Sequence, residues 1–93
     1  MFLARLLRRR RRPDLHFTLF TRQVCHLCDD AEAVLRQAQQ RYGFDLETKD
    51  VDTKPEWVEQ YGDCVPVVLV NGKVRFRGKV NGVLLQKIVD ADG

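Results

Sequence analysis

Two cysteines separated by two residues, Cys25 and Cys28, are the side chains in this sequence best suited to covalent chemistry. Thiols at this spacing can close a disulfide with each other, as in redox proteins of the α/β class. A short apolar run precedes the pair and an amphipathic stretch follows it, which predicts a strand-to-helix junction. The free N–H groups and the dipole at a helix N-terminus favour the thiolate of Cys25, the nucleophilic form. The pattern predicts thiol–disulfide exchange, in which Cys25 attacks a substrate and Cys28 resolves the mixed disulfide.

Other chemistries fit the pair less well. Two buried and inert thiols are disfavoured by the position at a helix terminus. A structural zinc ion needs about four ligands, and only Cys64, His16 and His26 remain as candidates. Haem attachment requires a histidine directly after the second cysteine, where this chain has Asp29. We therefore expect no metal ligands here.

Charged and titratable residues lie on both sides of the pair. Arg22 places a fixed positive charge three residues before Cys25, and His26 adds a titratable donor directly after it. Both favour a thiolate, whereas Asp29 and Asp30 oppose one if they point the same way. The sequence leaves the net effect on Cys25 open.

A second motif, Val65-Pro66, stands at the start of an apolar run. A trans proline there would only mark a strand edge, because proline has no N–H to donate. A cis peptide would instead expose the backbone of Val65 to a partner chain. Cys64 could be a small buried hydrophobe, or it could lie near the redox pair and form an alternative disulfide.

The patterns around these motifs predict the elements that position them. Alternating or continuous apolar residues indicate strands, and apolar residues three and four apart indicate helices. The expected strands are Leu15–Phe20, Phe44–Val51, Val65–Val70 and Val74–Phe76, the last two joined by an Asn71-Gly72 hairpin. Helices are expected from the cysteine pair to Gly43, from Pro55, and from about Asn81. The order β-α-β-α-β-β-α predicts an α/β fold with a four-stranded mixed sheet flanked by helices.

Two of these helices carry apolar stripes that should be buried. In the long helix the stripe consists of Leu27, Ala31, Val34, Leu35, Ala38 and Tyr42. In the last helix it consists of Leu84, Leu85, Ile88 and Val89.

Charge is divided unevenly along the 93 residues. Residues 1–13 hold six arginines and no acid, which leaves 10 basic against 13 acidic residues, a net charge of −3, for residues 14–93. We expect residues 1–13 to be a disordered basic tail that folding does not require, because its like charges repel. The tail could contact acidic surfaces, whereas the acidic domain of residues 14–93 is not expected to bind nucleic acid.

Three cysteines are too few for a disulfide-stapled secreted scaffold, and residues 1–7 lack the pattern of a secretory signal. No stretch approaches the ~18 apolar residues of a membrane-spanning helix. These features predict a single monomeric domain in the cytoplasm.

The segments TLFTRQVCHLCDDAE and YGDCVPVVLVNGK, together with the terminal helix, resemble the glutaredoxin-like branch of the thioredoxin-fold superfamily. The resemblance covers residues 15–91 and implies a thioredoxin/glutaredoxin-like fold for the domain of residues 14–93. Cys25 matches the nucleophilic cysteine of the family, and Cys28 matches the resolving cysteine. The residues between them differ, since this chain has His26-Leu27 where glutaredoxins usually have Pro-Tyr.

The resemblance also implies a surface that binds the substrate. Pro66 matches the cis-proline of the family, and Val65 matches the residue whose backbone pairs with a substrate peptide or glutathione. Arg22 stands where glutaredoxins hold a glutathione carboxylate. Glutaredoxins usually carry two glycines before the last helix, whereas this chain has Arg77-Gly78, so we expect it to bind glutathione weakly. The expected substrate-binding residues are Arg22, His26, Val65, Pro66 and Gly78.

The function predicted from these features is a thiol–disulfide oxidoreductase. It would act as a reductase on protein or small-molecule disulfides and would require no cofactor. One alternative is an iron–sulfur or metal carrier that uses Cys25 with external thiols, as some glutaredoxin relatives do. The other is a non-catalytic interaction module of the thioredoxin fold, whose basic tail docks on acidic lipid or RNA.

Overall fold

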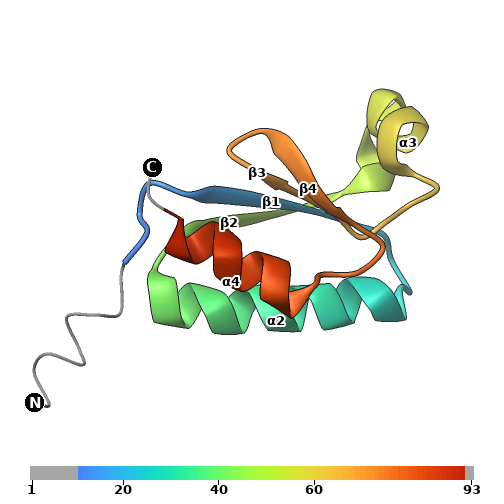
Figure 1. Ribbon diagram of the computed structural model, residues 1–93. Helices are drawn as coiled ribbons and strands as arrows, with labels where there is room; N and C mark the ends of the chain where they lie inside the picture. The colour runs from blue at the N-terminus through green and yellow to red at the C-terminus, as the bar shows by residue number, and fades with distance from the viewer. Residues whose placement is uncertain (1–10, 92–93) are drawn as a thin grey trace, which may run out of the picture.

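A mixed four-stranded sheet in the order β2-β1-β3-β4 runs through the domain (Figure 1). The computed structural model describes residues 11–91. The strands are β1 (His16–Thr21), β2 (Asp45–Asp50), β3 (Val67–Val70) and β4 (Lys73–Arg77). The helices are α2 (His26–Tyr42), α3 (Pro55–Tyr61) and α4 (Gly82–Asp90), with a 3-10 turn, η1 (Val51–Thr53), before α3. The predicted element order is confirmed, and only η1 has no counterpart in the prediction.

The strand pairing brings three chain segments to one end of the sheet. β1 pairs in parallel with β2, up to the register pair Thr21 and Asp50. β1 also pairs antiparallel with β3, where Phe20 lies opposite Val67. The residues that follow β1 and β2 therefore meet the residues that precede β3. This end of the sheet carries the cysteine pair.

The core has two parts, one on each face of the sheet. Helices α2 and α4 cover one face and α3 covers the other (Figure 1). Phe17 and Leu19 of β1 pack in the cluster under α2 and α4, whereas Phe20 packs with Val51 and Tyr61 in the smaller cluster under α3. Successive side chains of β1 thus alternate between the two faces of the sheet. None of the helices within residues 11–91 has the length and apolar character needed to cross a membrane.

The helix ends follow from local chemistry, but one buried stripe differs from its prediction. Gly43 ends α2 in a left-handed conformation, with φ 70°, that a residue without Cβ adopts at no steric cost. The side chain of Asn81 caps α4 by accepting hydrogen bonds from two backbone N–H groups. In α2 the predictions for Leu27 and Val34 were wrong: they are 54% and 38% exposed. The face of α2 turned to the sheet is narrower and buries Cys28 instead.

Arg12 belongs to the folded domain. Its side chain is only 3% exposed, and its Nη1 atom donates to the carbonyl of Val89 at 2.9 Å and to that of Ala91 at 2.6 Å. Its Nε and Nη2 atoms also donate to the carboxylate of Asp14 at 3.1 and 2.9 Å. Packing of the domain therefore begins before the expected boundary after Pro13. The disorder expected for residues 1–10 lies outside the described residues.

Candidate active site

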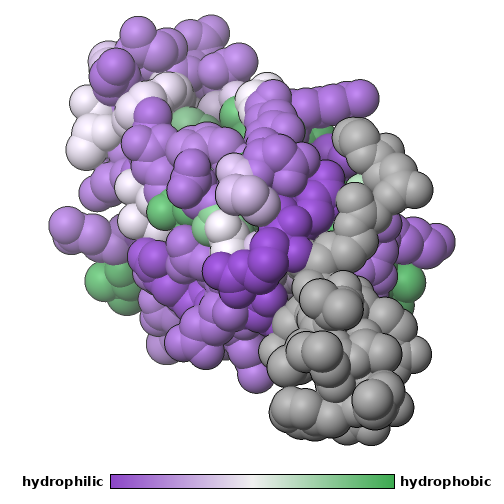
Figure 2. Space-filling model, turned by 90° about the vertical axis from the view of Figure 1, so that its left-hand side faces the viewer, coloured by the Kyte–Doolittle hydropathy of each residue, from purple (hydrophilic) through white to green (hydrophobic). Residues whose placement is uncertain are grey.

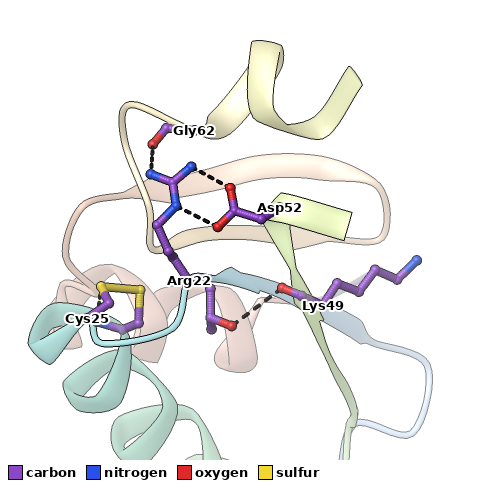
Figure 3. Close-up of a disulfide and its surroundings, with 7 residues drawn as sticks. Arg22, Cys25, Lys49, Asp52 and Gly62 are labelled. Carbon is purple, nitrogen blue, oxygen red and sulfur yellow. Dashed lines mark hydrogen bonds and ion pairs between the residues drawn. A yellow bond between two sulfur atoms is a disulfide. The ribbon is translucent and has the colours of Figure 1, made fainter. Parts of the chain in front are cut away.

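Cys25 and Cys28 form a disulfide across the first turn of α2, with their Cα atoms 5.2 Å apart (Figure 3). Cys25 is the N-cap residue, and its Sγ accepts a hydrogen bond from the backbone N–H of Cys28 at 3.1 Å. The N-cap position faces the N–H groups that have no partner within the helix. After reduction, the N–H of Cys28 lies where it can stabilise a thiolate on Cys25.

The two sulfur-bearing residues differ in accessibility. Cys28 is 2% exposed and belongs to the buried face of α2, whereas Cys25 is half-buried at the start of the helix. A partner sulfur can therefore approach Cys25 but not Cys28. Cys25 is therefore the accessible cysteine of the pair, and the roles assigned to the two thiols stay predictions.

Val24, directly before the pair, has an unusual backbone and a fully exposed side chain. Its φ is 54°, in the left-handed region, and its side chain is 99% exposed. A left-handed conformation costs roughly 1–2 kcal/mol for a residue with a Cβ atom, and β-branching makes it rarer still. Backbone strain of this kind is concentrated at functional sites. The chain thus presents an apolar side chain to solvent directly before Cys25.

Replacing Val24 with Asn is expected to raise the free energy of unfolding by about 0.5–1 kcal/mol, because Asn tolerates the left-handed region and no buried contact is lost. Thermal unfolding of the oxidised protein measures the effect as a rise in Tm of a few degrees. The matched control is Val83→Asn in α4, an exposed valine without positive φ, which should not gain stability. If the Val24→Asn protein is no more stable than the wild type, the backbone of Val24 is not strained.

The guanidinium of Arg22 is bound to the domain rather than free for a ligand. Its Nε and Nη2 atoms each lie 2.9 Å from a carboxylate oxygen of Asp52, and its Nη1 donates to the carbonyl of Gly62 at 2.9 Å. Figure 3 shows the guanidinium directed toward Asp52 and Gly62 and away from the disulfide. Arg22 thereby ties the loop before Cys25 to η1 and to the end of α3. The resemblance implies that Arg22 binds a carboxylate of glutathione. To do so, the Arg22 side chain would have to leave Asp52.

The pair of Arg22 and Asp52 should make stability depend on acid pH. Hydrogen bonds from Arg22 hold the pKa of Asp52 below its ordinary value of 3.8. Because the folded pKa is the lower one, the pair stabilises the fold above pH 3.8 and loses this contribution as the pH falls through the folded pKa. Thermal unfolding across pH should therefore show a small Tm deficit of Asp52→Asn at neutral pH, small because the pair is partly exposed, that vanishes in acid. A deficit that grows on acidification would contradict this assignment.

Val65 and Pro66 lie at the same end of the sheet as the cysteine pair. The Val65–Pro66 peptide is cis, and Pro66 is buried. Because Val67 pairs with Phe20, Val65 and Pro66 extend past the last strand pair toward the loop that carries Cys25. Within residues 11–91, neither the N–H nor the C=O of Val65 makes a backbone hydrogen bond. Both groups therefore remain available to a partner chain.

Gly78 is brought next to this segment and to the cysteine motif. Its N–H donates to the carbonyls of Cys64 at 3.1 Å and Pro66 at 2.7 Å. It also lines a hollow of about 210 Å³ beside the first turns of α2, together with Leu27, Asp30, Ala31, Val34, Lys79 and Val80. His26 is exposed at the start of α2. Of the expected substrate-binding residues, Val65, Pro66 and Gly78 are thus clustered, and the Arg22 side chain turns away.

Cys64 is half-buried, and the structure describes no disulfide for it. Its Sγ accepts a hydrogen bond from Arg77 at 3.2 Å and lies 3.5 Å from the carbonyl of Tyr61. Among residues 11–91, no three His, Cys, Asp or Glu side chains are grouped so that they could hold a metal ion.

Three features of this site are missing from the sequence prediction: the Asp52 and Gly62 partners of Arg22, and the left-handed backbone of Val24. A signal for Asp52 does exist. Parallel strands end at the same edge, so a charged residue just after β1 and an opposite charge just after β2 should meet. The backbone of Val24 has no such signal, because valine ordinarily avoids positive φ.

The sequence pattern of the family Glutaredoxin-like domain (DUF836) matches residues 16–90. The chain belongs to this glutaredoxin-like family. Among solved structures, the glutaredoxin-like chain is similar to a structural genomics target protein from X. campestris, with 27% identity and a TM-score of 0.67 over 83% of this chain and 99% of that chain.

Two thioredoxins share the fold of the glutaredoxin-like chain at lower identity. A mutant thioredoxin from Halobacterium salinarum is 20% identical, with a TM-score of 0.63 over 83% of this chain and 73% of that chain. The oxidised mitochondrial thioredoxin 3 from Saccharomyces cerevisiae is 18% identical, with a TM-score of 0.60 over 95% and 84% of the two chains. The thioredoxin fold and the cysteine pair together support a thioredoxin-like redox role.

Proposed function

We propose that this glutaredoxin-like protein is a thiol–disulfide oxidoreductase that reduces protein disulfides. One observation carries the proposal: an accessible cysteine at the N-cap of α2 is joined to a buried cysteine one turn later. The helix N-terminus supplies the N–H groups that favour a thiolate at Cys25. Because Cys28 is buried, it would act only in the second step, in which it attacks the mixed disulfide on Cys25.

The reaction starts from the reduced pair. The Cys25 thiolate attacks one sulfur of the substrate disulfide, a bond forms between the two sulfurs, and the other substrate sulfur leaves as a thiolate. Cys28 then loses its proton to solvent and attacks the Sγ of Cys25. The mixed disulfide breaks, and the second substrate thiolate leaves. Two electrons have passed to the substrate, and an external thiol reductant restores the pair.

The residues around Val65 would hold the substrate. The free N–H and C=O of Val65 suit an extended peptide. The backbone of such a peptide can hydrogen-bond to both groups, as a strand does when it adds to the edge of a sheet. Leu27 and Val24 offer apolar contacts on either side of Cys25, and the hollow beside Gly78 offers a recess. These features favour a peptide segment flanking the substrate cysteine.

Reduction of insulin disulfides by the pre-reduced protein tests this proposal. We expect stoichiometric release of insulin thiols, and turnover when a dithiol reductant is supplied in excess. The matched control is Cys64→Ser, which removes the third thiol and should retain turnover. A wild-type rate no faster than that of the reductant alone would contradict the proposed function.

Glutathione is expected to be a poor electron donor, because the Arg22 guanidinium is already bound to Asp52 and to the Gly62 carbonyl. A glutathione carboxylate would have to displace a bidentate partner. The measurement is reduction of a small mixed disulfide with glutathione as sole donor, compared with a thioredoxin reductase system. Efficient turnover with glutathione that is lost in Arg22→Ala would contradict this expectation.

A further inference from the structure

The end of the domain away from the cysteine pair carries a basic hollow. It has a volume of about 360 Å³ and lies between the start of β1, the β3–β4 turn and α4. Among residues 11–91, its lining includes three cations, Arg12, Arg75 and Lys87, and no carboxylate. Its apolar lining includes Leu15, just before β1, and Leu84 and Ile88 of α4. Figure 2, which looks at this end, shows a mainly hydrophilic surface with a few hydrophobic residues between.

A β-bulge in β4 accounts for the position of Arg75. Val68 pairs with Phe76 and Leu69 pairs with Val74, so Arg75 is the extra residue of the bulge. In a regular strand, Arg75 and Phe76 would point to opposite faces of the sheet. Here Phe76 packs in the core under α4, and Arg75 also lines the hollow beside α4. The bulge therefore adds a positive charge on the α4 side.

Two of the three cations are open to an external anion. Arg75 and Lys87 are exposed, and neither forms an ion pair within residues 11–91. Arg12 differs, since Asp14 and two helix-end carbonyls hold its side chain. Arg11 is exposed beside it and is the fourth of five consecutive arginines, Arg8–Arg12. We call Arg11, Arg12, Arg75 and Lys87 the basic end.

The basic end and the cysteine pair lie at opposite ends of α2. The N–H of Arg12 donates to the carbonyl of Tyr42, the last residue of that helix, at 2.6 Å. Cys25 is the N-cap at the other end of the same helix. At about 1.5 Å per residue, the 17 residues of α2 separate the two ends by roughly 25 Å. A large flat partner bound at the basic end would leave the cysteine pair open to solvent.

We propose that the basic end, together with the sequence before it, docks the domain on an anionic lipid bilayer. The preceding residues combine an apolar part (Met1-Phe2-Leu3 and Leu6-Leu7) with a run of arginines. Apolar insertion and a polybasic patch are the two signals that together hold a protein on a membrane surface, since either alone is weak. A single-stranded nucleic acid is the less suitable partner, because no aromatic side chain among the described residues lines the hollow to stack on a base.

Flotation of the full chain with lipid vesicles tests the proposal. The vesicles contain phosphatidylcholine alone or equal parts of phosphatidylcholine and phosphatidylglycerol. We expect binding to the anionic vesicles that weakens as salt is raised and little binding to the neutral ones. The double variant Arg75→Glu/Lys87→Glu should bind at least about tenfold more weakly, since each basic residue contributes a considerable share of the attraction. The matched control, Lys49→Glu/Lys54→Glu, changes charge equally next to Trp57 of α3, on the other face of the sheet, and should bind as the wild type does.

Far-UV circular dichroism checks that both variants fold. If Arg75→Glu/Lys87→Glu does not fold, the milder variant Arg75→Ala/Lys87→Ala takes its place. Equal binding to neutral and anionic vesicles would overturn the proposal. Wild-type binding by the variant that lacks the Arg75 and Lys87 charges would also overturn it. Binding to a single-stranded RNA, with no binding to vesicles, would overturn it as well. Alkylation of Cys25 in the reduced, vesicle-bound protein should be as fast as in solution. Strong protection of Cys25 would overturn the proposed orientation.

Discussion

Replacing Cys28 with Ser is expected to trap the substrate as a stable mixed disulfide on Cys25. The first step needs only the thiolate at the N-cap, which this variant keeps, whereas the buried thiol that would resolve the intermediate is gone. Replacing Cys25 with Ser should abolish both turnover and trapping, because the remaining thiol of the pair, Cys28, is 2% exposed and cannot reach a substrate sulfur. Mass spectrometry of the protein after mixing with a disulfide substrate distinguishes these outcomes.

The same asymmetry should appear in the alkylation rates of the reduced protein. Iodoacetamide at about pH 6 should modify Cys25 much faster than Cys28 or Cys64, because it reacts with thiolates that are accessible. Cys64→Ser is the control and should leave the Cys25 rate unchanged. Trapping by the Cys25→Ser variant, or equal alkylation of the two motif cysteines, would reverse the assigned roles. Loss of bound iron from both variants without any trapping would favour the metal-carrier alternative instead.

Replacing Arg12 with Ala is expected to lower the free energy of unfolding by about 2 kcal/mol. The buried guanidinium donates to Val89, Ala91 and the Asp14 carboxylate, and hydrogen bonds that involve a charged group contribute about 1.5–3 kcal/mol. For a domain of this size a loss of 2 kcal/mol lowers Tm by about 8–16 °C. Thermal unfolding followed by far-UV circular dichroism measures the change. The neighbouring exposed variant, Arg11→Ala, is the control and should have little effect.

Two shortened chains separate the role of Arg12 from that of the preceding sequence. A chain that begins at Arg11 keeps the guanidinium, and a chain that begins at Asp14 lacks it. The second chain should unfold at a lower temperature than the first by about the deficit of Arg12→Ala. Equal Tm values for the two chains would show that Arg12 contributes nothing to stability and that the domain is complete from Asp14.

The fold followed from patterns that are local in sequence. The Asn71-Gly72 turn, the alternation around Phe17 and the glycine after Tyr42 each mark a local backbone choice, and the structure has the expected element at each. The prediction for Leu27 was wrong for a non-local reason. Apolar spacing shows which side chains share a helix face, but the exposed first turn of α2 depends on what else packs there.

The site divides in the same way. The chemistry of Cys25 and Cys28 was predictable, because two residues of spacing at a helix start determine both the disulfide and the N-cap position. The partners of Arg22 were not predicted, because Asp52 is 30 residues away and meets it only through the parallel pairing of β1 with β2. Only that pairing, and no local pattern, indicates the contact.

The sequence by itself determined the element order and the position of the cysteine pair at a helix start, both of which depend on residues within a few positions of one another. Only the tertiary structure decided how distant charges pair. It bound Arg22 to Asp52, buried Arg12 against the end of α4, and directed Arg75 toward α4 through a bulge. The physical reason is that an arginine side chain is long, polar and indifferent to local backbone conformation. Its position is therefore set by whichever carboxylates and carbonyls the completed fold brings within reach.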